Sequence, residues 1–183
     1  MRGPVRFLFS LFTAALLALA ASAALADSKA LIDAKSQEAL ERLRDHAAGA
    51  DKLLEKAAGV LVFPDIVKMG FGVGGQYGEG SLLVDGKPEA YYATAGATFG
   101  LQLGAQYKTE MILFMTEEAL NGFRARPGWE VGVDSRVALV ETGRGGRVDV
   151  RKVADPVVGF IFSNEGLTHD LSLKGSKIRR IAR

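Results

Sequence analysis

The chain has 183 residues, of which 48% are hydrophobic, with 23 Lys or Arg residues, 21 Asp or Glu residues and a formal net charge of +2. This length suits one domain with a sizeable core, and a charge so near zero disfavours nonspecific binding to nucleic acid. The chain contains no cysteine, which excludes disulfides, thiolate catalysis and the lipobox cysteine that would carry a lipid anchor.

Residues 1–26 are predicted to be a cleaved signal peptide. Arg2 and Arg6 precede a long apolar run, and Ala24-Leu25-Ala26 fits the cleavage site. The alternative is an uncleaved membrane anchor, because the apolar run nearly reaches spanning length. Residues 27–183 would then form a single exported domain, in the periplasm or attached to the cell envelope. Its 21 basic and 21 acidic residues would balance, because Arg2 and Arg6 leave with the signal peptide.

Residues 28–57 predict one long helix, because apolar residues recur there at helical spacing. Gly49 is expected to weaken or bend it. The charges of this helix are nearly balanced, which favours packing on the domain's own sheet over a basic membrane-surface helix. The apolar stripe consists of Ile32, Ala39, Leu40, Leu43, Ala47, Ala50, Leu54 and Ala57.

Alternating hydrophobicity predicts strands in the next part of the chain. Pro64-Asp65 is expected to stop the first strand, and Asp85-Gly86 is typical of a tight hairpin turn. In the fourth strand, Phe99 to Tyr107 would bury one face and Lys108 would belong to the polar face. The last strand is apolar throughout and is expected to be buried on both faces. The expected strands are 60–63, 81–84, 91–94, 99–107 and 111–115.

Thr116 is predicted to cap a short helix that ends at Phe123 and has acidic residues in its first turn. Turns are expected at 143–146 and 164–166. The order of elements predicts an α+β fold, with a long N-terminal helix and a short helix packed on an extensive, strongly curved antiparallel sheet. The remaining expected strands are 129–140, one around 148–150, 157–162, 167–173 and 177–181.

Gly70, Gly72 and Gly75 spell the G-x-G-x-x-G pattern of dinucleotide-binding proteins. That chemistry requires a helix directly after the glycines and an acidic residue about twenty positions further on. The sequence predicts neither, so the pattern indicates architecture and no nucleotide cofactor.

The same block contains Gly72, Gly74, Gly78 and Gly80, which share one parity and leave one strand face nearly bare. A bare face permits close approach of another element, such as a side chain of the long helix, or a bulge and a sharp bend. A ligand could also occupy it.

Residues for catalysis or metal binding are scarce. His46 and His169 are the two histidines, and neither lies among further ligands at metal-binding spacing. No serine-nucleophile elbow is present. The sequence therefore predicts no enzyme, no catalytic residues, no metal and no cofactor.

Many short motifs occur in an order that resembles the SYLF domain family, over about 29–181. The motifs are Val60 to Pro64 (VLVFP), Lys68 to Phe71 (KMGF), Gly74-Gly75, Gly78 to Gly80 (GEG), Tyr91-Tyr92, Gly100 to Gln106 (GLQLGAQ), Phe114-Met115, Ala119-Leu120, Phe123, Gly128 to Asp134 (GWEVGVD), Phe162 to Asn164 (FSN) and Gly166-Leu167.

The resemblance implies a lipid-binding domain. Eukaryotic members of the family bind phosphoinositides, fungal members also bind actin, and bacterial members are exported stand-alone domains. Binding by animal members resembles insertion of a basic amphipathic N-terminal helix, whereas the helix here is charge-balanced. Export would separate the chain from actin and from cytoplasmic phosphoinositides, so an actin partner is not expected.

The C-terminal tail from Lys174 onward has five basic residues and no acid. Together with the resemblance, this favours contact with anionic phospholipid or a membrane surface. The candidate lipid-binding residues are Lys68, Lys174, Lys177, Arg179 and Arg180. A solvated edge strand that its charges protect from aggregation explains the tail equally well. The alternative function is an envelope scaffolding or interaction protein without a lipid ligand, which could be a homo-oligomer.

Overall fold

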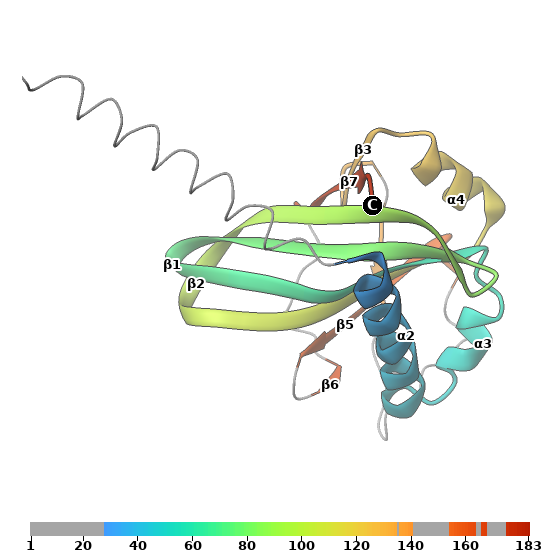
Figure 1. The fold of residues 1–183 in the computed structure, drawn as a ribbon, viewed down its shortest axis with the longest axis horizontal. Coiled ribbons are helices and arrows are strands. Elements are labelled where there is room, and N and C mark those ends of the chain that lie inside the picture. Colours follow the sequence, from blue (N-terminus) through green and yellow to red (C-terminus); the bar gives the residue numbers. More distant parts are fainter. Residues whose placement is uncertain (1–27, 135, 141–153, 164–165, 168–174) are drawn as a thin grey trace, which may run out of the picture.

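The computed structural model describes residues 28–134, 136–140, 154–163, 166–167 and 175–183. The fold is α+β, as predicted, with helices packed on a strongly curved sheet (Figure 1). The helices are α2 (Lys29–His46), α3 (Ala50–Leu54) and α4 (Glu117–Arg124). The strands are β1 (Gly59–Val84), β2 (Lys87–Phe114), β3 (Gly128–Glu130), β4 (Ala138–Leu139), β5 (Val157–Ser163), β6 (Gly166–Leu167) and β7 (Lys177–Ile181).

The described strands form one sheet in the order β3-β7-β2-β5-β4, with β1 paired to β2 and β6 paired to β5. The pairs are antiparallel except for β4 with β5, which is parallel, so the sheet is mixed. Strand β2 is the centre of this arrangement because its first part pairs with β7 and its last part pairs with β5.

The two longest strands form a single hairpin that joins at Asp85-Gly86, the predicted turn. The expected strand stop at Pro64 was wrong. The register shifts between Phe63 and Ile66, so Pro64 lies at an irregularity where its missing N–H costs no ladder bond. Its carbonyl accepts a hydrogen bond of 2.6 Å from the Thr109 hydroxyl. The five strands expected between 60 and 115 are therefore two continuous strands of 26 and 28 residues.

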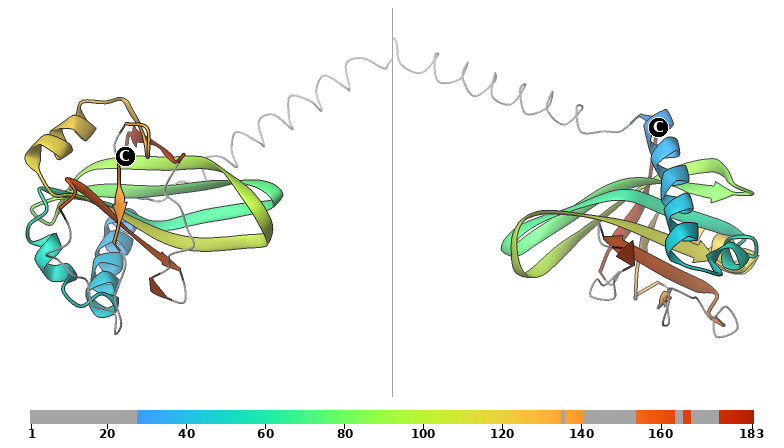
Figure 2. Two further views of the ribbon diagram at one scale, coloured as in Figure 1. Left: turned by 180° about the vertical axis from the view of Figure 1, so that it is seen from behind. Right: turned by 90° about the horizontal axis from the view of Figure 1, so that it is seen from below.

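The hairpin folds back on itself, and the glycine face makes this possible. A Cβ at Gly70 would lie 2.6 Å from the Cα of Gly74, and one at Gly78 would lie 2.7 Å from the Ile66 side chain. A Cβ at Gly80 would overlap the carbonyl oxygen of Val62. The first half of β1 itself thus packs against the bare glycine face. This contact takes the place of the helix side chain or the ligand that the sequence left open. We call residues 69–75 and their β2 partners 97–105 the bend (left end of the sheet in Figure 1; Figure 2 shows it from behind and below).

Folding back creates an inner face and an outer face. Leu61, Phe63, Leu82 and Ile112 are inner-face residues, and they form one buried core between the two layers. Helix α4 closes this core, with Phe123 stacked on Phe114 at 4.9 Å between ring centroids. Tyr92 and Trp129 join the same aromatic cluster, so these two aromatic residues are core residues.

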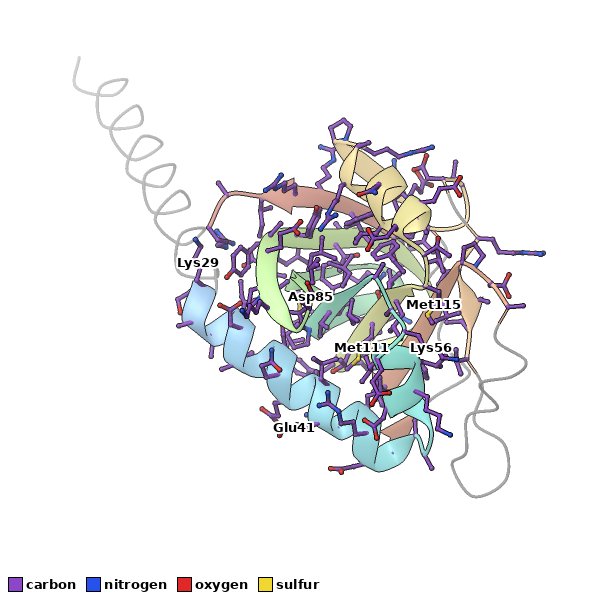
Figure 3. All side chains as sticks on the ribbon, turned by 90° about the vertical axis from the view of Figure 1, so that its right-hand side faces the viewer. Lys29, Glu41, Lys56, Asp85, Met111 and Met115 are labelled. Atoms are coloured by element: carbon purple, nitrogen blue, oxygen red, sulfur yellow. The ribbon has the colours of Figure 1, made fainter. Side chains whose placement is uncertain are left out.

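Helix α2 covers the outer face of the sheet and buries a second core against it (Figure 3, where α2 runs from Lys29 past Glu41). The predicted apolar stripe is the buried face, and each fully buried large side chain of this kind contributes about 1.5–3 kcal/mol. The helix begins after Ser28, whose hydroxyl accepts a hydrogen bond from the Leu31 N–H. The prediction of one continuous helix was wrong, because the helix ends at His46 and Gly49 adopts φ 97°, a left-handed conformation.

The strands after α4 follow the prediction in part. Thr116 caps α4, and β5 and β7 occupy the expected residues. The long strand expected over 129–140 was wrong. Backbone N–H groups of Val133 and Asp134 bond to the Glu130 carbonyl, and the Asp134 carboxylate accepts from the Glu130 N–H, so a turn replaces the strand. The turns expected at 143–146 and 164–165, and strand residues 148–150 and 168–173, lie outside the described residues.

The glycine contact is testable by adding one methyl group. We expect Gly80→Ala to lower the free energy of unfolding by about 1–3 kcal/mol, because its Cβ meets backbone that cannot rotate away. The control is Gly122→Ala in α4, where nothing lies within 4 Å and stability should rise by up to about 1 kcal/mol. Urea unfolding of both variants measures this, and an unchanged Gly80→Ala midpoint would contradict the close packing.

Candidate functional site

Strand β7 holds three of the five residues predicted to bind lipid. Lys177, Arg179 and Arg180 are all exposed. Lys177 has its ammonium 3.7 Å from a carboxylate oxygen of Glu130 on β3, a loose surface pair. Neither arginine forms an ion pair within the described part of the chain. Lys174 lies outside the described residues.

The β7 residues do not share one face. Strand side chains alternate, so Lys177 and Arg179 point to one side of β7 and Arg180 points to the other. Ile178, between them, is buried in the inner core. The basic tail is therefore a strand that the buried Ile178 holds in the core. Its charged side chains face solvent on both sides of the strand.

Arg180 helps to line a shallow hollow of about 480 Å³ at the C-terminal end of β7. The Lys29 ammonium lies 5.5 Å from the centre of the Tyr91 ring in the same hollow. The acidic residue among those that line it, Glu89, is paired with Arg124. The hollow is thus net basic and lined by Lys29, Glu89, Ala90, Tyr91, Arg180, Ile181, Ala182 and Arg183.

Lys68 lies on the other layer of the hairpin, next to the bend. It pairs with Gln106 across the strands and is only partly exposed. Burial lowers the pKa of Lys68, and the neighbouring Lys108 ammonium lowers it further. An anion near Lys68 would relieve this repulsion.

Lys108 and Glu110 form a buried ion pair, with the ammonium nitrogen 2.5 Å from a carboxylate oxygen. The prediction that Lys108 belongs to an exposed polar face was wrong. Lys108 lies opposite Ile66, a residue of the inner core, so the folded hairpin turns Lys108 inward and leaves its neighbour Tyr107 exposed. Burial raises the pKa of Glu110, and the Lys108 charge offsets part of that rise.

Neither residue of this pair lines the hollow at the C-terminal end of β7, the hollow beside α4 or the hollow beside α3. A substrate would have no path to it through them. We therefore assign it a structural role within the inner layer.

The structure gives no support for metal chemistry in the part of the chain that it describes. No group of three or more His, Asp or Glu side chains is placed there to hold a metal ion. His46 is exposed and its Nδ1 lies 2.9 Å from the Arg42 carbonyl oxygen, whereas His169 lies outside the described residues. Among the helices described, none combines the length and apolar character needed to cross a bilayer.

Two basic residues near the candidate site were not predicted as site residues. Lys29 begins α2, and its position beside Arg180 depends on how α2 packs across the sheet. Arg183 belongs to the same one-signed tail as the predicted residues, so the charge pattern could have included it. The Arg183 guanidinium pairs with Glu79.

Comparison with protein families matches residues 95–182 to the model described as "Ysc84: Las17-binding protein actin regulator". The matched segment begins in the middle of β2 and includes the bend-side part of β2, α4 and β7. This match agrees with the resemblance to the SYLF family that the sequence motifs indicate. Comparison with curated proteins found no match.

The structural role of the buried pair leads to a double-mutant test. We expect Glu110→Leu alone to cost about 3–5 kcal/mol of stability, because it leaves the Lys108 ammonium buried without a partner. Adding Lys108→Met should recover most of that loss, since two apolar side chains then replace the pair. Urea unfolding measures both variants. A double variant as unstable as the single one would show that the pair is not the relevant interaction.

Proposed function

We propose that this chain is a non-enzymatic lipid-binding domain of the bacterial cell envelope that contacts anionic lipid through basic surface residues. The resemblance to the SYLF family, with which the family match agrees, supports a lipid-binding role. The observation that carries the proposal is the pair of exposed arginines, Arg179 and Arg180, which stand beside Lys177 without an ion pair inside the described chain.

Guanidinium groups that form no ion pair with the described residues suit phosphate. A planar guanidinium donates two parallel hydrogen bonds to phosphate oxygens, and it is charged at every relevant pH. Lys68, Lys174 and Lys177 would add point charges, each worth about 1 kcal/mol near an anionic surface. Phosphate-bearing headgroups are therefore the ligand chemistry that we propose.

The proposal omits the actin role in the family's description. It assumes that the chain is outside the cytoplasm, on the basis of the signal peptide expected at residues 1–26. An exported chain would not meet actin. A membrane surface would remain available to it.

Vesicle flotation tests the proposal. We expect the domain from Asp27 onward to float with anionic phospholipid vesicles at low salt and to release them as salt rises. A triple variant, Lys177→Gln with Arg179→Gln and Arg180→Gln, should bind about a hundredfold more weakly, since about 3 kcal/mol of surface attraction is removed.

The matched control removes three exposed lysines elsewhere. Lys52 and Lys56 lie in and after α3, and Lys87 begins β2 at the hairpin turn, all away from β7 and from the bend (Figure 3 labels Lys56). Their triple change to Gln should weaken binding far less. An equal loss of vesicle binding in both triple variants would show that binding depends on net charge and not on the position of the basic residues. A domain that stays soluble with anionic vesicles while light scattering shows an oligomer would favour the scaffolding function instead.

A further inference from the structure

The bend exposes apolar side chains at one end of the molecule. Met69 is 60% exposed and Val73 is 67% exposed, and the Tyr77 and Tyr107 rings are about half exposed just beyond them. These four residues come from both layers of the folded hairpin. We call them the bend cluster.

The outward direction of the bend cluster follows from the glycine contact. Gly70, Gly74 and Gly78 face the opposite layer of the hairpin, so the side chains that alternate with them along β1 must face outward. The protein cannot bury this cluster by slipping the strand, because a one-residue slip would place side chains where only glycine fits.

This end of the molecule also carries no charge. No charged residue occurs between Lys68 and Glu79, or between Glu89 and Lys108. A strand that must stay in water usually carries charges that prevent association. Their absence from residues 69–78 and 90–107, combined with exposed Met and Val, is typical of a surface that leaves water during function.

Basic and aromatic groups border the uncharged end on both layers. Lys68 immediately precedes the bend on one layer, and Lys177 pairs with Ala95, two residues outside the bend, on the other. Tyr77 lies directly opposite Ala95, so a tyrosine and a lysine occupy the same level. This arrangement matches the layers of a bilayer leaflet. The apolar residues at the tip correspond to the hydrocarbon, the tyrosines above them to the interface, and the lysines beside the tyrosines to the anionic headgroups.

We propose that the bend is a membrane-insertion element, which places Met69 and Val73 at the boundary between headgroups and acyl chains while Lys68 and Lys177 contact anionic headgroups. The inference rests on the proposed lipid-binding function and names the part of the surface that enters the lipid. Entry is shallow, since the outer edge of the two-stranded ribbon has unpaired backbone groups that require water or headgroups. The occupant is a lipid surface, because lysines and tyrosines border the exposed apolar side chains in the order of headgroup, interface and hydrocarbon.

A single fluorescent label tests the insertion directly. The chain has no cysteine, so Val73→Cys supplies one attachment point for an environment-sensitive dye. We expect the dye emission at position 73 to shift to the blue on vesicles with about 30% anionic lipid, because a probe at the depth of an interfacial segment leaves water. Spin labels on the acyl chains should quench the same dye.

The matched control places the dye at Leu139→Cys, on β4 beside β5 and away from the bend. Its emission should not change. If the protein floats with the vesicles but the dye at position 73 stays in water, the bend does not insert, although the lipid-binding function stands. If the dye shifts as protein concentration rises without lipid, the bend joins two copies of the chain and the inference is wrong.

A charge variant provides the second test. Met69→Asp with Val73→Asp should weaken vesicle binding at least about tenfold, because two carboxylates would have to enter the interface. Leu31→Asp with Leu139→Asp is the control, since these side chains are 43% and 41% exposed and lie elsewhere. At high salt, the native domain should keep some binding to neutral vesicles, and the bend variant should lose it. This result would support insertion even if the domain showed no preference for anionic lipid. Unchanged binding by the bend variant would overturn the inference.

Discussion

The contact between the two halves of β1 determines the shape of this protein. Gly80 can lie against the Val62 carbonyl only because it has no side chain, and Gly70 and Gly74 meet in the same way within the bend. Close packing of this kind leaves no room for a methyl group, so the glycines fix where the hairpin folds. Both layers of the sheet, and the core between them, follow from this contact.

The same contact sorts the side chains by their position. Inward-facing residues form the aromatic and aliphatic core that α4 closes, and they include the buried pair of Lys108 and Glu110. Outward-facing residues are covered by α2 over one part of the sheet and stay exposed at the bend. The protein thereby has one end that is packed with helices and one end that is uncharged and bare, an asymmetry that suits membrane contact.

The sequence predicts this fold where local physics decides it. Short-range rules predict three features correctly: the apolar face of α2 from the spacing of its apolar residues, the Thr116 cap of α4, and the turn at Asp85-Gly86. Parity of the glycines predicts a bare strand face, but the identity of its occupant depends on a contact between distant parts of β1. For the same reason, alternation alone predicts Lys108 to be a surface residue, and the fold of the hairpin turns it inward. Charge predicts the basic residues of β7, and strand alternation divides them between two faces, but which strands lie beside them depends on the fold.

The proposed membrane contact consists of the bend and the neighbouring part of β7. Hydrogen–deuterium exchange of the domain with and without anionic vesicles tests it directly, because amides that leave water exchange more slowly. We expect slower exchange confined to residues 66–78, residues 95–107 and the start of β7. Slower exchange confined to α2 would instead indicate contact through the N-terminal helix, and would contradict it.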